Sequence, residues 1–443
     1  MPSLRNISFS VALLATPAAA QPSLPPQRPL GPIVATSIVP LGAVSAVRQL
    51  PGGKVLVNDI AGRKVVLFDS TLATFTVIAD TTSATANAYS SRAGGLIGWK
   101  GDSTLFVDPQ SLSMLVLDPA GRVTRVMSAP RANDVNSLIG GPGGVPAIDA
   151  RGRLVYRAQP QFRMPAPQPG PGLTMPPMPD SAPIVRFDLA ERKLDTVAMV
   201  RIPKQNVSAS RDEQGRMRVM VTMNPMPVAD DWAMLADGTV AVVRGSDYHV
   251  DLVRADGTRV SSPKVSFDWK RLSDDDKTAF IDSTRTAMEK MRANIMAQPG
   301  APGAQGAAAP GASRGAPGGD GQVVMRMEGG GANHGAAPPA APAGGQALQL
   351  PPINMVPISE LPDYAPAFAP GSARGDLDGN LWLRTSKVVN GGSQYDVLNG
   401  KGELVDRVSM PAGRVIAGFG RGGLVYMGVR DSTGVRLEAA KVR

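Results

Sequence analysis

The sequence predicts an all-β fold, a six-bladed β-propeller built from four-stranded antiparallel blades. Short apolar strands alternate with tight turns along most of the chain, as is typical of sheet proteins. Turn glycines or their equivalents stand at positions 53, 102, 152, 238, 379 and 423, so successive turns are 49, 50, 86, 141 and 44 residues apart. Three of these spacings match the roughly 40 to 50 residues of a four-stranded blade, and two indicate insertions.

The stretch from Trp232 to Arg259 shows one such unit most clearly. Ala236-Asp237-Gly238 and Ala255-Asp256-Gly257 are turns in which glycine supplies a positive φ, and Gly245-Ser246-Asp247 reverses the chain between apolar runs. A lone hairpin cannot bury its apolar faces, so this unit needs neighbours of its own kind. We interpret it as the fourth of six blades.

The other five units repeat the same order of turn, b strand, c strand and d strand. Their expected strands are 54–58, 64–68 and 75–79; 103–107, 114–117 and 123–127; 153–156, 184–187 and 194–200; 380–383, 395–398 and 404–408; and 424–427 with 435–442. The last unit lacks a fourth strand, and the strand-like run 33–39 lacks a blade. We expect this N-terminal strand to close the ring and remove an open edge. Two stacked β-sandwiches are the alternative, which needs no such regular repeat.

The first twenty residues predict export from the cytoplasm. Arg5 precedes the short apolar run 7–15, and Ala18-Ala19-Ala20 forms a small-residue cleavage site. We expect a signal peptide over residues 1–20, cleavage near Ala20, and a periplasmic or secreted protein that begins with a Pro-rich leader over 21–32. No other run reaches the length of a membrane span. The chain has no cysteine, which excludes disulfides, thiolate metal sites and a cysteine nucleophile.

The net charge of +9 does not predict nucleic-acid binding. Its lysines and arginines are scattered singly, and few aromatic residues accompany them. We expect a monomer with a solvated basic surface, and a small anionic ligand or an unidentified protein as its partner.

Three insertions are expected on one face of the ring, because b–c and d–a loops leave the same face of a propeller. They cover residues 159–183, 204–229 and 267–370 of the propeller domain, which itself spans 33–443. The longest begins with an amphipathic helix over 273–298, with Ser273 as its N-cap. The Ala/Gly/Pro tract that follows predicts disorder over 299–345, because such a composition cannot bury a core.

The blade motifs resemble those of six-bladed β-propellers of the TolB-like and NHL-like kind. The resemblance rests on the block from Asp237 to Asp251 and on Asp376-Leu377-Asp378-Gly379-Asn380-Leu381-Trp382-Leu383-Arg384. The resemblance covers nearly the whole mature chain. The sequence is especially similar to secreted bacterial propellers without an assigned function. The resemblance implies a binding module or, alternatively, a metal-dependent lactonase or esterase. No WD40 signature is present, since Asp231-Trp232 and Asp268-Trp269 stand outside the position it needs.

Charged residues follow five of the b strands, on the face that bears the insertions. They are Asp59, Asp108, Arg157, Arg244 and Arg384. Two c strands carry an aspartate where the others are apolar, and we expect two structural charge pairs, Arg244 with Asp251 and Arg384 with Asp396. Val185 occupies the corresponding position beside Arg157, so Arg157 is the best candidate to meet an anionic ligand. Arg157, Arg244, Arg384 and Tyr248 are the expected ligand contacts.

Catalytic and metal sites are weakly indicated. His249 is one of two histidines, and Ser246 near it lacks the Gly-x-Ser-x-Gly turn of a nucleophile, so no catalytic residue is assigned. No cofactor is expected. An all-oxygen Ca²⁺ site using Asn58, Asp59 and Asp108 is the remaining possibility for a metal. The leading hypothesis is therefore an extracytoplasmic binding or scaffold propeller, and the alternative is a metal-dependent hydrolase with a divalent ion at the channel mouth.

Overall fold

The computed structural model describes residues 24–82, 88–89, 92–160, 178–204, 206–211, 217–296, 353–431 and 434–442. The expected signal peptide, the expected disordered tract and most of the segment 159–183 lie outside the described residues. None of the described helices is long and apolar enough to cross a membrane.

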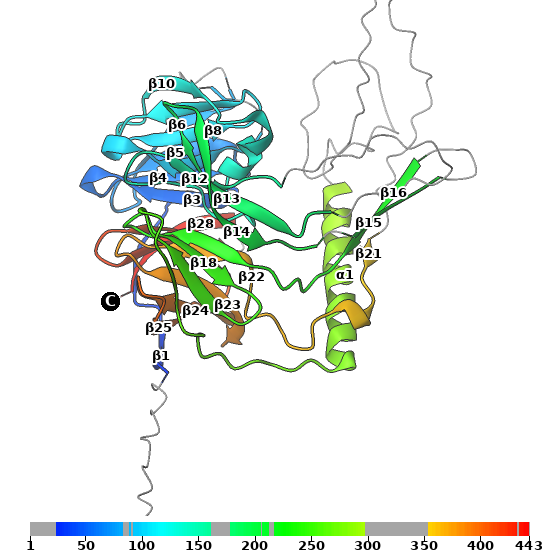
Figure 1. Ribbon diagram of the computed structural model, residues 1–443. Helices are drawn as coiled ribbons and strands as arrows, with labels where there is room; N and C mark the ends of the chain where they lie inside the picture. Colours follow the sequence, from blue (N-terminus) through cyan, green and yellow to red (C-terminus); the bar gives the residue numbers. More distant parts are fainter. Residues whose placement is uncertain are drawn as a thin grey trace, which may run out of the picture.

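The described chain forms a six-bladed β-propeller, as predicted (Figure 1). The first strand of each blade is the innermost one. The first three blades contain β3 (Val44–Gln49), β4 (Val55–Asp59), β5 (Lys64–Phe68) and β6 (Phe75–Asp80) in blade 1; β7 (Gly95–Gly98), β8 (Thr104–Asp108), β9 (Ser113–Leu117) and β10 (Val123–Ser128) in blade 2; and β11 (Ala147–Ile148), β12 (Leu154–Arg157), β13 (Ser181–Asp188) and β14 (Lys193–Arg201) in blade 3. The other three contain β17 (Asp231–Met234), β18 (Val240–Arg244), β19 (His249–Val253) and β20 (Arg259–Ser261) in blade 4; β22 (Phe368–Gly375), β23 (Leu381–Val389), β24 (Gly392–Leu398) and β25 (Leu404–Ser409) in blade 5; and β26 (Arg414–Gly420), β27 (Leu424–Asp431) and β28 (Gly434–Lys441) in blade 6.

The ring is closed by an N-terminal strand, which confirms that prediction. Strand β2 (Ile33–Thr36) pairs antiparallel with β28 and becomes the fourth strand of the sixth blade. The chain then continues into the first blade, so that the two ends of the propeller are joined through backbone hydrogen bonds. A further strand, β1 (Gln27–Pro29), lies parallel to β25 at the outer edge of the fifth blade. The sequence did not indicate β1, because three residues in a Pro-rich leader show no strand pattern.

The core lies between neighbouring blades rather than in one central mass. Val155 and Ile184 of the third blade, for example, pack with Trp232, Val240 and Val242 of the fourth. These residues alternate along their strands with residues that face the other neighbour, which is the pattern of a sheet buried on both faces. The turns between strands follow their sequence signals: Gly238 has φ +82°, and Asp237 accepts hydrogen bonds from the backbone and hydroxyl of Thr239.

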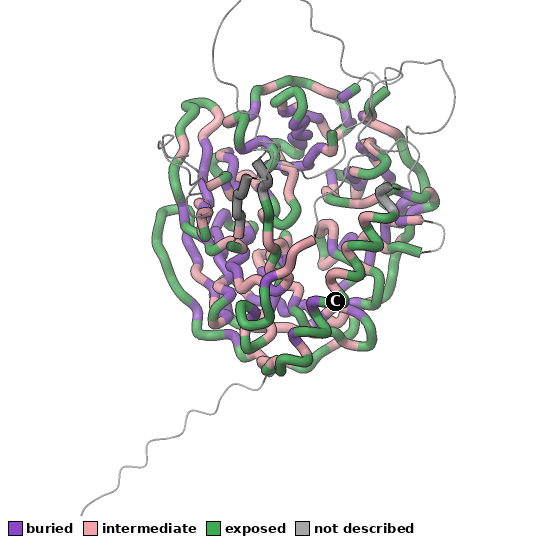
Figure 2. The backbone as a smooth tube through the Cα atoms, turned by 90° about the vertical axis from the view of Figure 1, so that its right-hand side faces the viewer, coloured by how far each residue is buried: buried purple, intermediate pink, exposed green. Residues whose placement is uncertain are grey.

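Two insertions combine into one small subdomain on one side of the ring. Strands β15 (Asn206–Arg211) and β16 (Met217–Met223) come from the insertion 204–229, and β21 (Asn354–Met355) from the insertion 267–370 pairs with β16. Helix α1 (Asp274–Met296) joins them through an apolar cluster of Met226, Ile281, Val356 and Leu361. Figure 1 shows the helix standing to one side of the blades. Figure 2 looks from that side and shows buried segments running through the blades.

The strand pairing between the two insertions was not expected from the sequence. Residues 223 and 355 are separated by the whole fourth blade and α1, so no local pattern links them. The backbone of residues 270–272 also pairs with that of 363–365, which joins the outgoing and returning chains of the longer insertion.

Candidate functional site

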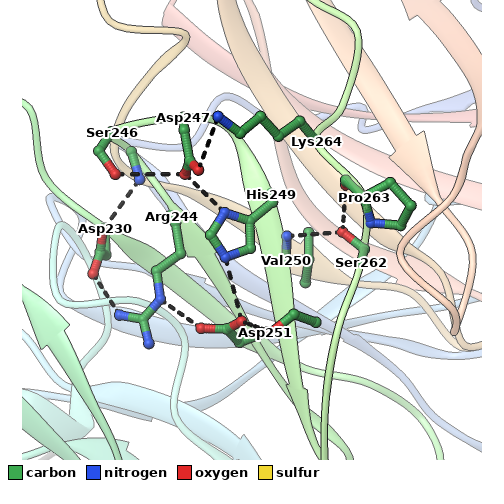
Figure 3. Close-up of polar contacts among 12 residues, drawn as sticks. Asp230, Arg244, Ser246, Asp247, His249, Val250, Asp251, Ser262, Pro263 and Lys264 are labelled. Carbon is green, nitrogen blue, oxygen red and sulfur yellow. Dashed lines mark hydrogen bonds and ion pairs between the residues drawn. The ribbon is translucent and has the colours of Figure 1, made fainter.

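Arg244 lies at the centre of a charge network at the end of β18 (Figure 3). Its Nε donates to Asp251 Oδ2 at 2.7 Å, and its Nη1 donates to Asp230 Oδ2 at 2.7 Å and to the Met199 carbonyl at 3.0 Å. The structure therefore places Arg244 beside Asp251, as the sequence suggested, and adds Asp230 as a second carboxylate partner. Three of its five N–H donors are thus directed at groups of its own fold, so Arg244 links blades 3 and 4 and keeps only Nη2 for a ligand.

His249 lies between two carboxylates and does not face a serine. Its Nδ1 is 2.7 Å from Asp247 Oδ1, and its Nε2 is 3.4 Å from Asp251 Oδ1 (Figure 3). The Ser246 hydroxyl is directed at Asp247, at 3.5 Å. Because both ring nitrogens face carboxylates, the geometry of a Ser-His-Asp triad is not formed here.

Tyr248 is a structural residue, which corrects its assignment as a ligand contact. Its side chain is fully buried, and its hydroxyl donates to Asp396 Oδ2 at 2.9 Å, across the interface between blades 4 and 5. Burial, together with the nearby Asp396 carboxylate, raises the pKa of Tyr248 well above its ordinary value. The phenol thus stays neutral and cannot reach a ligand on the surface.

Arg384 does not face Asp396, so the second expected pair is corrected as well. In the fourth blade Val242 stands opposite Asp251 and Arg244 opposite His249, which puts Arg244 and Asp251 on the same face.

In the fifth blade Leu383 stands opposite Asp396, and Arg384 stands opposite Tyr395. Thr385 is therefore the counterpart of Arg244, and Arg384 points to the other face. Asp396 is held instead by Tyr248, Gln394 and Arg407, whose Nε lies 3.4 Å away. Arg244 lies six residues after its turn glycine, Gly238, whereas Arg384 lies five residues after Gly379, and a difference of one residue reverses the face of a strand.

The candidate Ca²⁺ ligands do not converge. Both carboxylate oxygens of Asp59 accept backbone N–H groups, from Gly42, Ala43 and Gly62. Asn58 is the adjacent residue of β4, so it projects to the opposite face, where its Nδ2 donates to the Gly94 carbonyl. Asp108 belongs to the second blade, where it accepts a hydrogen bond from the Ser111 hydroxyl. Across the described part of the chain, no group of three His, Asp or Glu side chains is placed to hold a metal ion. Asn58 and Asp59 face opposite sides of β4, so the three residues do not form the expected Ca²⁺ site together.

An arginine cluster, consisting of Arg157, Arg374 and Arg384, lies near the inner strands beside a buried carboxylate, Asp231. Arg157 ends β12, Arg374 lies on the inner strand β22, and Arg384 lies on β23. Asp231, the first residue of β17, acts electrostatically on both Arg157 and Arg374, and Arg384 acts on Arg374. Neither Arg157 nor Arg384 makes an ion pair or side-chain hydrogen bond with any residue that the structure describes. The cluster thus combines three cations with a single carboxylate.

Asp231 is too deeply buried to contact a ligand, but its negative charge acts on the neighbouring arginines Arg157 and Arg374. Its side chain is 2 % exposed; Oδ2 accepts the backbone N–H groups of Ser372 at 2.6 Å and Ala373 at 2.8 Å, and Oδ1 accepts that of Trp232 at 2.9 Å. These bonds tie the inner strands of blades 4 and 5 together. Burial raises the pKa of Asp231 to about 6, although the three hydrogen bonds and Arg374 act in the opposite sense.

Burial also lowers the pKa of both Arg157 and Arg374, with Asp231 opposing it in each case. Arg374 Nη1 donates to the carbonyls of Gly371 and Ala373. A second negative charge beside these guanidinium groups would be favourable, because one carboxylate compensates only part of their desolvation.

A glycine-rich loop, residues 139–146, lies against this cluster. Its Gly143 carbonyl accepts a hydrogen bond from Trp232 Nε1 at 2.8 Å. A Cβ at Gly144 would lie 2.3 Å from Trp232 Nε1, and a Cβ at Gly371 would lie 2.9 Å from Pro142 Cα. Both glycines also have positive φ, so only glycine fits at either position. The loop from between blades 2 and 3 therefore packs across blade 4 to the inner strand of blade 5.

The pH dependence of stability should report on Asp231. Its pKa is about 6 in the folded protein and 3.8 ordinarily, so between these values the folded chain binds more protons than the unfolded chain. Its contribution to the free energy of unfolding therefore falls as pH rises from 4 to 6, by about 3 kcal/mol. Urea denaturation at pH 4, 5, 6 and 7 should show that wild type loses this amount relative to Asp231→Asn. Parallel pH profiles for the two proteins would contradict the assignment.

Sequence reasoning missed Asp231 and Arg374 as members of the site. Asp231 was noted only for standing outside a WD40 position, and Arg374 precedes a turn with nothing local to distinguish it. The sequence did contain one signal: Asp231 begins an apolar inner strand, where a buried carboxylate needs hydrogen-bond donors or cations as partners. Those partners, Ser372 and Ala373, lie 141 and 142 residues away in sequence.

Comparison with known proteins shows structural similarity to solved structures but identifies no family. No family model matches the chain, and no curated protein matches it. Among solved structures, a putative gluconolactonase shares 14% identity over 96% of this chain and 97% of its own, with a TM-score of 0.38. Regucalcin, a calcium-binding protein from Agrobacterium tumefaciens, shares 11% identity over 94% of this chain and 97% of its own, with a TM-score of 0.39. Virginiamycin B lyase from Staphylococcus aureus shares 8% identity over 91% of this chain and 87% of its own, with a TM-score of 0.32. At these identities and scores, the likenesses carry no argument about function.

Proposed function

We propose that this protein is an extracytoplasmic binding propeller that holds a small anionic ligand at the arginine cluster. The observation that supports the proposal is the excess of cations: Arg157 and Arg374 share the single carboxylate of Asp231, and Arg384 adds a third positive charge beside Arg374. Buried or half-buried guanidinium groups are normally paired, because unpaired burial of charge is costly. A carboxylate or phosphate ligand would supply the missing negative charge through charge-assisted hydrogen bonds.

The location of the cluster also favours ligand binding. Arg157 ends β12 on the side from which the insertions leave, and Arg384 lies within β23; loops at one face of a rigid scaffold are where binding residues concentrate. The neighbouring loop 139–146 is rich in glycine, so its backbone can approach a ligand closely. Export of the protein, with cleavage near Ala20, is part of this proposal; N-terminal sequencing of protein isolated from its host should begin at Gln21.

The binding proposal predicts a specific loss in Arg157→Ala. Titration of citrate, succinate and inorganic phosphate, followed by calorimetry, should show saturable binding of at least one of these probes to wild type. Removing one charge-assisted hydrogen bond should weaken it by about tenfold or more. Arg122→Ala is the matched control: this arginine lies in the turn between β9 and β10, its side chain is 81% exposed, and it pairs with Asp118.

Two outcomes would contradict the binding proposal. One is the absence of saturable binding by every probe, and the other is an equal loss in Arg157→Ala and Arg122→Ala. The competing proposal, a metal-dependent hydrolase, makes a different prediction in the same preparation. It requires that Ca²⁺ or another divalent ion raise the melting temperature and that a chelator reverse the change, whereas the observed partners of Asn58, Asp59 and Asp108 predict no such change.

A further inference from the structure

A cleft of about 140 Å³ opens between blades 3 and 4, away from the arginine cluster. Its apolar lining consists of Ala198 from β14 and of Val242 and Val253 from the fourth blade, all buried. The rest of the lining lies toward the outer strand β20 and is mostly polar. It comprises Arg244, Asp251, Arg259, Val260 and Ser261.

The cleft follows from the residues on one face of the fourth blade. Val242, Asp251 and Ser261 stand opposite one another across β18, β19 and β20, so this face changes from apolar to polar toward the rim of the ring. The Ser261 hydroxyl donates to Asp251 Oδ1 at 2.5 Å, and both residues line the cleft. Strand β20 has only three residues, so no further side chain of that strand covers the opening.

The charges around the cleft leave one cation without a carboxylate. Arg244 pairs with two carboxylates, Asp251 and Asp230. Arg259 donates through Nη2 to the Val197 carbonyl at 2.7 Å and makes no ion pair within the described parts of the chain. Its remaining N–H groups stand at the edge of an apolar floor.

We propose that this cleft binds a small monocarboxylate with an aromatic or short alkyl body. An apolar protein cavity of roughly this size accepts a six-membered ring, and Ala198, Val242 and Val253 provide the apolar surface for it. The carboxylate would accept hydrogen bonds from Arg259, the cation that the fold leaves unpaired. The site differs in position and in residues from the arginine cluster, so it does not depend on the function proposed above.

Benzoate is the probe that tests this inference. Calorimetric or NMR titration of the full chain should show saturable benzoate binding. Ala198→Leu, which fills the floor, should abolish this binding. Arg259→Gln should weaken benzoate binding by about tenfold, the loss of one charged hydrogen bond, and leave binding of the uncharged benzyl alcohol within about twofold.

The two proposals are separable in the same experiment. Arg157→Ala should bind benzoate as wild type does, even if it fails to bind citrate or phosphate. The inference is overturned if benzoate does not saturate wild type, or if Arg259→Gln binds benzoate as tightly as wild type. Arg259 is exposed, so its variant should fold even if Ala198→Leu does not.

Discussion

Removing residues 24–36, which contain β1 and β2, is expected to lower the free energy of unfolding by roughly 5 kcal/mol or more. Strand β2 pairs with β28, and the chain after it adds bonds from Ser37 to Leu437 and between Leu41 and Val435. Without β2 the edge of β28 would be open, with the buried side chains of Leu437 and Ala439 beside it. Urea denaturation followed by circular dichroism measures the loss, and aggregation should rise with it.

A shorter deletion provides the control for this prediction. Removing residues 24–30 takes away β1 alone, with its three-residue pairing to β25 and the ion pair of Arg28 with Asp406, and should cost much less. A synthetic peptide covering residues 31–43 should restore part of the stability of the longer deletion. If both deletions behave alike, ring closure by β2 is not what stabilises the propeller.

Asp396→Ala is expected to cost about 3 to 5 kcal/mol of folding free energy, because it leaves a buried cation unpaired. Asp396 is fully buried and accepts hydrogen bonds from Tyr248 at 2.9 Å and Gln394 at 3.0 Å, with Arg407 Nε at 3.4 Å. The Arg407 side chain is 11% exposed, so water can replace the carboxylate only in part. The contacts join blades 4 and 5, and their loss should weaken that interface.

Tyr248→Phe separates the charge from the hydrogen bond. It removes one hydroxyl from Asp396 and keeps Arg407 paired, so its cost should be about 1 to 2 kcal/mol. Thermal and urea unfolding of both variants measure the difference. A loss below about 1 kcal/mol in Asp396→Ala would show that Asp396 does not hold these blades together.

The repeat of turns predicted the propeller because its physical causes are local. Positive-φ glycines, Asx turns and alternating apolar residues each act within a few positions, and six repetitions of them predict six blades. Closure by residues 33–39 was also predictable, because the sixth blade lacked its fourth strand and residues 33–39 formed a strand-like run outside every blade.

The candidate site was less predictable, because side-chain partners depend on register and on long-range packing. Arg244 and Asp251 are seven residues apart on one hairpin, and counting along the strands was enough to bring them together. Arg384 and Asp396 look equivalent in sequence, yet a difference of one residue directs them to opposite faces. Tyr248, which resembled a surface contact, is buried because the chain that follows the blade and the neighbouring fifth blade cover it: Phe267 and Phe368 both pack on its ring.

The sequence by itself determined the architecture of this protein, its number of blades and the strand that closes the ring. Only the tertiary structure decided which charges are satisfied. Asp231 meets Ser372 and Ala373 because the inner strands of blades 4 and 5 lie side by side, and it thereby comes close to Arg157 and Arg374. Turn and strand patterns act over a few residues, whereas the balance of buried charge is set by contacts between blades that are distant in sequence.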